Sequence, residues 1–241
     1  MSSEKEQPNN EKGEAEKFAW PPLESSPEVF TEYMHKIGLP NNYAIGEVYG
    51  FDEDLLAFLP QPIHATIICC ERRNKTQDKQ RGSESNVNQV QYFMKQTGTL
   101  DNACGIIACI HATLNSNADL ELKLPSDSIL GRFWKDTKSC TPMERCTALE
   151  RNDEFKIIHH GFASKGQSRE INSDQSAVKC HFIAHVIQNG KLVELDGTKA
   201  GPHIIGDCDD LLRGSILEVK RKLEDGEISE QLNMMTLNAA M

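Results

Sequence analysis

The chain has 241 residues, of which 38% are hydrophobic, and its formal net charge is -10 at pH 7. This length and composition are enough for one domain with its own hydrophobic core, and they do not require a second domain. The negative charge argues against a nucleic-acid-binding protein and suits a basic protein partner. An acidic surface that only keeps the protein in solution explains the charge equally well.

The cysteines are 8 in number, and no two of them form a C-x-x-C pair, so neither a zinc ribbon nor a thioredoxin-type site is expected. A domain of this size does not need disulfide bonds for stability, which favours a reduced, intracellular protein. Residues 1–17 contain no apolar run of the kind found in signal peptides, and the longest apolar stretches are too short to cross a bilayer. We therefore expect a monomer of the cytoplasm, with the nucleus as the alternative, and no membrane partner.

The first half of the chain gives alternating signals for helices and loops. Residues 1–17 are rich in Glu, Lys, Asn and Ser and predict a disordered tail. Residues 27–38 have helical spacing, with a proline at the start and a glycine at the end. A short helix is predicted at 52–59 and a buried strand at 63–70. Residues 72–88 are polar and predict a loop or a frayed helix.

The middle of the chain contains the most apolar predicted helix. Residues 103–114 are apolar on nearly every helical face, which is typical of a helix buried at the centre of a domain. Amphipathic helices are predicted at 126–135 and 142–151. Residues 161–177 are polar and predict an exposed loop that is long for a compact domain, and such loops are often functional.

The last third of the chain contains a predicted hairpin. Residues 179–187 and 192–195 predict two strands joined at Asn189-Gly190, which is a strong signal for a tight turn. An amphipathic helix at 209–224 and a strand at 232–237 follow. Helices and strands are intermixed, so the sequence predicts an α+β or three-layer α/β architecture.

Cys104 is the candidate nucleophile, because it stands where the apolar helix begins. Asp101 or Asn102 can cap that helix, which puts the Cys104 sulfur in the first turn, where the helix dipole favours a thiolate. The alternative is that Cys104 is a small buried core residue, as many free cysteines are. That alternative is the better reading for Cys109, which lies inside the helix.

His181 and Asp196 are the candidate base and its orienting group, because the predicted hairpin brings them together. If Asn189-Gly190 is a two-residue turn, Asp196 lies diagonally across from His181, within side-chain reach. A carboxylate beside an imidazole fixes its tautomer and stabilises the imidazolium. An inert His-Asp pair on the surface is the alternative, and the apolar residues of both strands argue against it.

His185 follows His181 by four positions, a spacing that would suit a metal ion on a helix. On a strand the two residues lie about 13 Å apart, too far to share one ion. We therefore expect no metal, and nothing in the sequence indicates a cofactor.

Gln96 is the candidate oxyanion stabiliser, with its side-chain amide and the backbone N–H of Cys104 as the two donors. The segments 93–97, 102–105, 181–184 and 194–197 closely resemble the ubiquitin carboxyl-terminal hydrolases, a family of papain-like cysteine peptidases. The separation from Gln96 to Cys104 is 104 - 96 = 8 positions, two more than is usual in that family. We expect the extra residues to bulge outward at 98–101, with the Gln96 amide pointing toward the Cys104 sulfur.

The resemblance implies that residues 18–241 form a catalytic domain. Its fold would be a papain-like core with a central antiparallel sheet flanked by helices, and its backbone would be knotted, which is rare. The residues 161–177 would be the crossover loop, which in the family passes over the active-site cleft.

The resemblance also implies the activity. The protein would be a thiol-dependent hydrolase that cleaves small adducts or short extensions from the C-terminal glycine of ubiquitin. Cys104 would be the nucleophile, His181 the base, and Asp196 its orienting group, while Gln96 would stabilise the oxyanion. Two alternatives stay open: a hydrolase of a related ubiquitin-like modifier, and a catalytically weak ubiquitin-binding module.

Overall fold

The computed structural model describes residue 18 and residues 20–73, 81–116, 124–163 and 180–240. Within these ranges the strands form one six-stranded sheet in the order β1-β6-β2-β3-β4-β5, and all neighbouring pairs are antiparallel. The strands are β1 (Tyr43–Glu47), β2 (Ile63–Arg72), β3 (Cys180–Gln188), β4 (Lys191–Leu195), β5 (His203–Asp207) and β6 (Ile228–Ala239).

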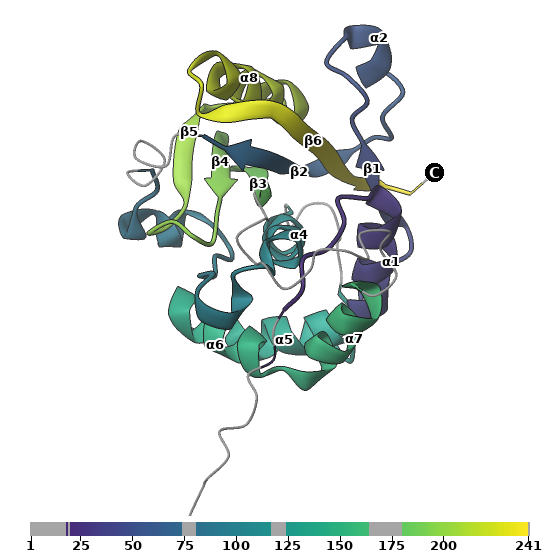
Figure 1. Ribbon diagram of the computed structural model, residues 1–241, viewed down its shortest axis with the longest axis vertical. Coiled ribbons are helices and arrows are strands. Elements are labelled where there is room, and N and C mark those ends of the chain that lie inside the picture. The colour runs from purple at the N-terminus through teal and green to yellow at the C-terminus, as the bar shows by residue number, and fades with distance from the viewer. Residues whose placement is uncertain (1–17, 19, 74–80, 117–123, 164–179, 241) are drawn as a thin grey trace, which may run out of the picture.

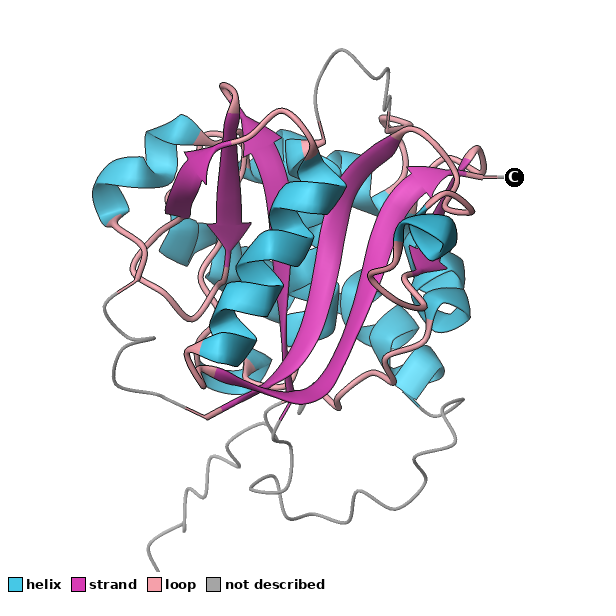
Figure 2. Cartoon of the chain, turned by 90° about the horizontal axis from the view of Figure 1, so that it is seen from above, coloured by secondary structure: helices cyan, strands magenta, loops and turns pink. Residues whose placement is uncertain are grey.

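Helices cover both faces of this sheet. Helix α8 lies over one face, and α4 lies against the other face with the remaining longer helices beyond it (Figure 1). Seen from above, one helix lies over the sheet and runs along its central strands (Figure 2). The helices are α1 (Pro27–Ile37), α2 (Glu53–Leu56), α4 (Cys104–Asn115), α5 (Ile129–Thr137), α6 (Pro142–Arg151), α7 (Asp153–Ala163) and α8 (Leu211–Glu224), with 3-10 helices η1 (Glu84–Gln89) and η2 (Gly98–Leu100). The α+β, three-layer prediction is confirmed.

Helix α4 is the centre of the fold, as its composition predicted. Every residue of α4 is buried, and the helix packs against β2 and β3. Its many small side chains, Ala, Cys and Gly among them, allow this close approach on all sides. Because α4 cannot shift without disturbing the core, its first residue has a fixed position relative to β3.

A second, smaller core lies under α8. Leu212, Ile216 and Val219 of α8 pack against Ile68 of β2 and Ile183 of β3. The hairpin strand β3 is therefore packed on both faces. This burial fixes the register of β3 against its neighbours, since a slip by one residue would reverse the apolar and polar faces.

The predicted hairpin is confirmed in turn and register. Asn189 and Gly190 both have positive φ, 52° and 71°, as a type I′ turn requires. Gln188 faces Lys191, and Ala184 faces Leu195. The helix at 27–38 is confirmed as well: Pro27 is its first residue, and Gly38 ends it with a φ of 125°.

Several elements differ from the prediction. Helix α7 occupies residues that carried no prediction and part of the predicted loop, and the short strands β1 and β5 were also missed. β6 is longer than the predicted strand at 232–237, and η1 gives structure to part of 72–88. Residues 1–17 and 164–179, which hold the predicted tail and most of the predicted loop, lie outside the described residues. Among the described helices, none has the length and apolar content that a bilayer crossing needs.

Candidate active site

Cys104 is the first residue of α4, and its side chain is buried with 6% of its surface exposed. The expected cap by Asp101 or Asn102 is wrong: Ala103 is the N-cap residue, and no side chain caps the helix. The reason is the local backbone. Ala103 has φ -85° and ψ 12° and donates its N–H to the Leu100 carbonyl, so a continuous turn leads into the helix. A capping side chain usually needs an extended residue at that point.

The hairpin brings His181 and Asp196 into direct contact, as predicted. Nε2 of His181 lies 2.8 Å from Oδ1 of Asp196. His181 is the second residue of β3, and Asp196 directly follows β4. The contact follows from the hairpin register, because the two residues are diagonal neighbours just beyond the pair of Ala184 and Leu195.

The His181 ring also forms a hydrogen bond with the Cys104 thiol. Since Nε2 faces Asp196, the nitrogen on the side of Cys104 is Nδ1. The structure therefore joins Cys104, His181 and Asp196 in one continuous chain of hydrogen bonds. Their elements are far apart in sequence, and α4 and β3 meet through their shared packing.

The charges of this chain are set by competition between burial and hydrogen bonding. Burial raises the pKa of Cys104, but the hydrogen bond and charge of His181 outweigh it and lower that pKa below its usual value. Burial lowers the pKa of His181, but the charge and hydrogen bond of Asp196 outweigh it and raise that pKa to about 8. Both shifts move the pair toward a thiolate beside an imidazolium.

His181 is not the only group that holds the Asp196 carboxylate. Oδ1 also accepts hydrogen bonds from the backbone N–H of Thr198 (3.0 Å) and from its hydroxyl (2.8 Å). Oδ2 lies 2.5 Å from Nη2 of Arg72 and 3.8 Å from Nζ of Lys199. Burial raises the pKa of Asp196, but His181, Arg72 and Lys199 together hold it far below its usual range. The carboxylate therefore stays ionised over the working pH range of a typical enzyme.

Sequence reasoning missed Arg72, Thr198 and Lys199. Thr198 and Lys199 follow Asp196 closely, so a search for donors just after the carboxylate could have found them. Arg72 ends β2 and is separated from Asp196 by 124 positions, and only the pairing of β2 with β3 brings the two together. No local pattern in the sequence carries that information.

Gln96 is buried beside the Asp196 loop. Its backbone N–H donates to the carbonyl of Gly197 (2.8 Å), and its side-chain Nε2 donates to the carbonyl of Asp101 (2.8 Å). The expected outward bulge at 98–101 is seen only in part: Gly98 and Asp101 are exposed, but residues 98–100 form the turn η2, in which Leu100 is fully buried and the Thr99 hydroxyl donates to Glu150 of α6 (2.7 Å). The apolar side chain of Leu100 draws the turn inward.

His185 takes part in a different cluster. Its Nε2 lies 3.3 Å from Oε2 of Glu194, and Lys222 of α8 donates to the same oxygen. All three side chains are buried. Glu194 is therefore the partner of His185. Among the described hydrogen bonds, none joins Glu194 to His181 or to Asp196.

Comparisons with known proteins show the family of the chain. Residues 20–224 match the family model described as ubiquitin carboxyl-terminal hydrolase, family 1. Ubiquitin carboxyl-terminal hydrolase 3 of Arabidopsis thaliana is 34% identical over 228 residues, which cover 91% of this chain and 94% of the relative. A ubiquitin carboxyl-terminal hydrolase of Drosophila melanogaster is 35% identical over 192 residues, which cover 77% of this chain and 81% of the relative.

A solved structure supports the fold. The Trichinella spiralis UCH37 catalytic domain, crystallised with ubiquitin vinyl methyl ester, superimposes with a TM-score of 0.73 over 92% of this chain and 96% of that one. The sequence identity between the two chains is 23%. At this identity the similarity concerns the fold.

Proposed function

This chain belongs to the ubiquitin carboxyl-terminal hydrolase family 1 and is a cysteine-type deubiquitinase, and we propose that Cys104, His181 and Asp196 carry its reaction. The observation that carries the proposal is the buried chain of hydrogen bonds from the Cys104 thiol through His181 to Asp196. A thiolate that already stands beside an imidazolium can attack a carbonyl without waiting for a base.

The first half of the reaction forms a thioester. The Cys104 sulfur attacks the carbonyl carbon of the last glycine of ubiquitin, and the electron pair of the C=O bond moves to oxygen. The backbone N–H of Cys104 and the second amide hydrogen of Gln96 stabilise this oxyanion. When the oxyanion collapses, the bond to the leaving group breaks, and His181 gives its Nδ1 proton to that group.

The second half restores the enzyme. His181, now neutral, takes a proton from a water molecule, and the oxygen of that water attacks the thioester carbonyl. The carbon–sulfur bond then breaks, Cys104 leaves as a thiolate, and ubiquitin departs with a free carboxylate. Asp196 keeps the His181 ring in one orientation and stabilises its charged form at both stages.

We propose small adducts and short extensions as the leaving groups. The support is the polar segment at 161–177, whose last residues lead into β3 and hence to His181. Residues 164–179 lie outside the described part of the chain, so the segment supports the proposal through its sequence and its point of attachment. We also propose that the enzyme is a monomer and that it works in the cytoplasm; the 8 free cysteines support the reducing compartment.

A ubiquitin probe with a vinyl methyl ester at its C-terminus tests the proposal. We expect one adduct, mapped to Cys104 by peptide mass spectrometry, and none with Cys104→Ser. Cys180→Ser is the matched control, because Cys180 is an exposed thiol one residue before His181, and this variant should react like wild type. Binding of ubiquitin without any adduct would instead describe a ubiquitin-binding module. A matching probe built on a ubiquitin-like modifier measures whether the enzyme prefers ubiquitin or that modifier.

A further inference from the structure

We infer that Arg72 is a positioning residue for the reaction, acting through Asp196. Arg72 is the last residue of β2, and its Nη2 lies 2.5 Å from Oδ2 of Asp196. The Arg72 side chain is 20% exposed, whereas that of Asp196 is 1% exposed, so the guanidinium lies between the carboxylate and the solvent. The inference rests on the proposed function, since it assigns Arg72 a part in orienting His181.

The contacts form a closed ring around the carboxylate. Nη1 of Arg72 donates to the Thr198 hydroxyl (3.2 Å), and that hydroxyl donates to Oδ1 of Asp196 (2.8 Å). Nη2 of Arg72 completes the ring at Oδ2. One arm of the guanidinium fork binds Oδ2 directly and the other arm reaches Oδ1 through the Thr198 hydroxyl, so both carboxylate oxygens are held. The orientation of Oδ1 decides where it accepts the hydrogen bond from His181.

The charge of Arg72 has a second effect. His181 is faced by groups from each element packed against it, namely Cys104 of α4, Asp196 with Lys199 after β4, and Arg72 with Cys70 of β2. Asp196 raises the pKa of His181 to about 8, and Arg72 opposes part of this increase. Removing the guanidinium should therefore raise the pKa of His181 further.

A lysine at this position cannot replace both effects. It would keep a positive charge near Asp196, but an ammonium is a point donor without the fork that reaches Thr198 at the same time. Arg72→Lys thus separates charge from geometry, and Arg72→Gln removes both. The two variants therefore report separately on the charge of Arg72 and on the geometry of its hydrogen bonds.

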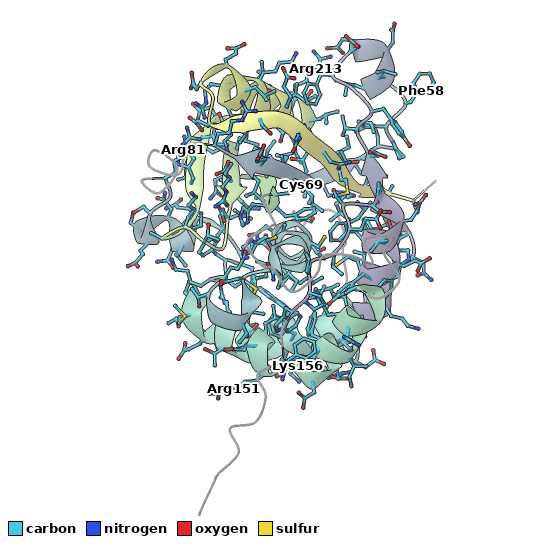
Figure 3. All side chains as sticks on the ribbon, in the orientation of Figure 1. Phe58, Cys69, Arg81, Arg151, Lys156 and Arg213 are labelled. Carbon is cyan, nitrogen blue, oxygen red and sulfur yellow. The ribbon has the colours of Figure 1, made fainter. Side chains whose placement is uncertain are left out.

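Arg81 provides a matched control. Its Nη2 lies 2.5 Å from Glu227, it also reaches Glu218 (3.4 Å), and its side chain is 17% exposed. It lies at the β5 side of the sheet (Figure 3). Arg81 therefore resembles Arg72 in burial and in binding carboxylates, but neither of the carboxylates that it binds is Asp196.

The experiment compares Arg72→Gln, Arg72→Lys and Arg81→Gln in a Cys180→Ser background, where the exposed thiol cannot interfere. The readouts are KM on a fluorogenic ubiquitin amide, and kcat on the same substrate as a function of pH. For Arg72→Gln we expect kcat to fall about tenfold with KM changed less than about twofold, as for a lost charged hydrogen bond. The alkaline limb of its pH profile should move up by about half a pH unit.

Arg72→Lys should keep the pH profile near wild type while kcat falls to an intermediate value. Arg81→Gln should change neither readout, although its melting temperature falls. A wild-type kcat and pH profile for Arg72→Gln would overturn the inference, and so would equal changes in Arg81→Gln. Asp196→Asn in the same assay separates the inference about Arg72 from the proposed role of Asp196 in the reaction. If Asp196→Asn stays fully active, the proposed role of Asp196 is wrong, whatever the result for Arg72→Gln.

Discussion

The side-chain amide of Gln96 donates a hydrogen bond to the carbonyl oxygen of Asp101, 2.8 Å away, and so closes the turn that leads to Cys104. The turn holds the two residues by which this chain exceeds the usual family spacing. An amide nitrogen carries two hydrogens, and this bond uses one of them. The longer connection is thus compatible with an oxyanion donor at Gln96, because the same side chain that could donate to the oxyanion also holds the insertion in place.

Replacing Gln96 tests that double role. Gln96→Ala should lower kcat on a fluorogenic ubiquitin amide by about a hundredfold, because one oxyanion donor is lost. Gln96→Glu is the informative partner, since it has nearly the same shape but places a carboxylate next to the Asp101 carbonyl and the oxyanion. We expect it to be at least as impaired as alanine. A loss of less than about fivefold in Gln96→Ala would mean that another group holds the oxyanion.

The pH dependence of turnover should report the His181–Asp196 pair. In the wild-type enzyme, kcat should fall as pH rises through about 8, because the imidazolium that protonates the leaving group loses its proton. The carboxylate of Asp196 raises the pKa of His181, so Asp196→Asn should move this limb to lower pH and reduce kcat by orders of magnitude. Initial rates from pH 6 to 10 measure both effects. A limb that stays at the wild-type position would mean that the Asp196 charge does not control His181.

The buried pair of Lys222 and Glu194 should matter for stability and not for turnover. Burial raises the pKa of Glu194, but Lys222 and His185 outweigh it and hold that pKa well below its usual value. Lys222→Met leaves the Glu194 charge buried without its cation, which typically costs about 3–5 kcal/mol of unfolding free energy. Urea unfolding at pH 7 measures this loss, and kcat below the unfolding range should stay at the wild-type value.

The sign of the pH effect gives a second check on this pair. Since the folded pKa of Glu194 is depressed, its contribution to stability is present at neutral pH and is lost as pH falls through that pKa. Lowering the pH should therefore reduce the difference in unfolding free energy between wild type and Lys222→Met. Lys191→Met is the control, because Lys191 forms an exposed pair with Asp207 and should leave the unfolding free energy nearly unchanged. If both variants lost the same unfolding free energy, burial of the pair would not explain the effect of Lys222→Met.

The size limit on leaving groups is tested at the segment 161–177. A Gly-Ser insert near Ser168 should raise cleavage of ubiquitin dimers and leave turnover of small adducts largely unchanged, because folded domains are roughly 20 Å or more across. An insert of equal length at the turn of Asn189-Gly190, which lies at the far end of the β3–β4 hairpin from His181, serves as the control. If the unmodified enzyme cleaved dimers as fast as small adducts, the segment would not limit access.

Local chemistry explains which parts of the site the sequence could predict. The contact of His181 with Asp196 follows from one hairpin, whose register can be counted from the turn at Asn189-Gly190. Helix α4 was predictable because it is apolar on every face. These signals lie within a few residues of the features that they predict, so no knowledge of the distant chain is needed.

Contacts between distant segments were the part that could not be predicted. Arg72 reaches Asp196 only because β2 lies beside β3 in the sheet. Strands β1 and β5 are only five residues long, and in β1 the buried Tyr43 and Ile45 alternate with small residues, while no residue of β5 is fully buried, so neither strand gives a clear polar-apolar alternation in the sequence. The course of η2 depends on Leu100 finding a buried site and on Thr99 finding Glu150 of α6. A spacing count shows that extra residues exist but not the direction in which they fold.

Gly197 offers the sharpest test of how the site is assembled, because it joins the Asp196 loop to the loop segment that contains Gln96. A Cβ at Gly197 would lie 2.8 Å from the Cβ of Gln96 and 3.1 Å from its backbone nitrogen. The carbonyl of Gly197 accepts the Gln96 N–H at 2.8 Å, so the two segments cannot separate without losing that bond. Gly197→Ala must therefore shift Asp196 or Gln96, both of which are proposed to act in the reaction.

We expect Gly197→Ala to lower kcat by about tenfold to a hundredfold, since small displacements of catalytic groups have effects of this size. Gly206→Ala in β5 is the matched control, because a Cβ there meets no atom within 4 Å and should leave kcat unchanged. Labelling with the ubiquitin vinyl methyl ester should slow in proportion to kcat, while ubiquitin binding to the Cys104→Ser form of each variant stays constant. Wild-type turnover in Gly197→Ala would show that the two segments can move apart without harm. Asp196 would then not depend on the Gln96 segment for its position.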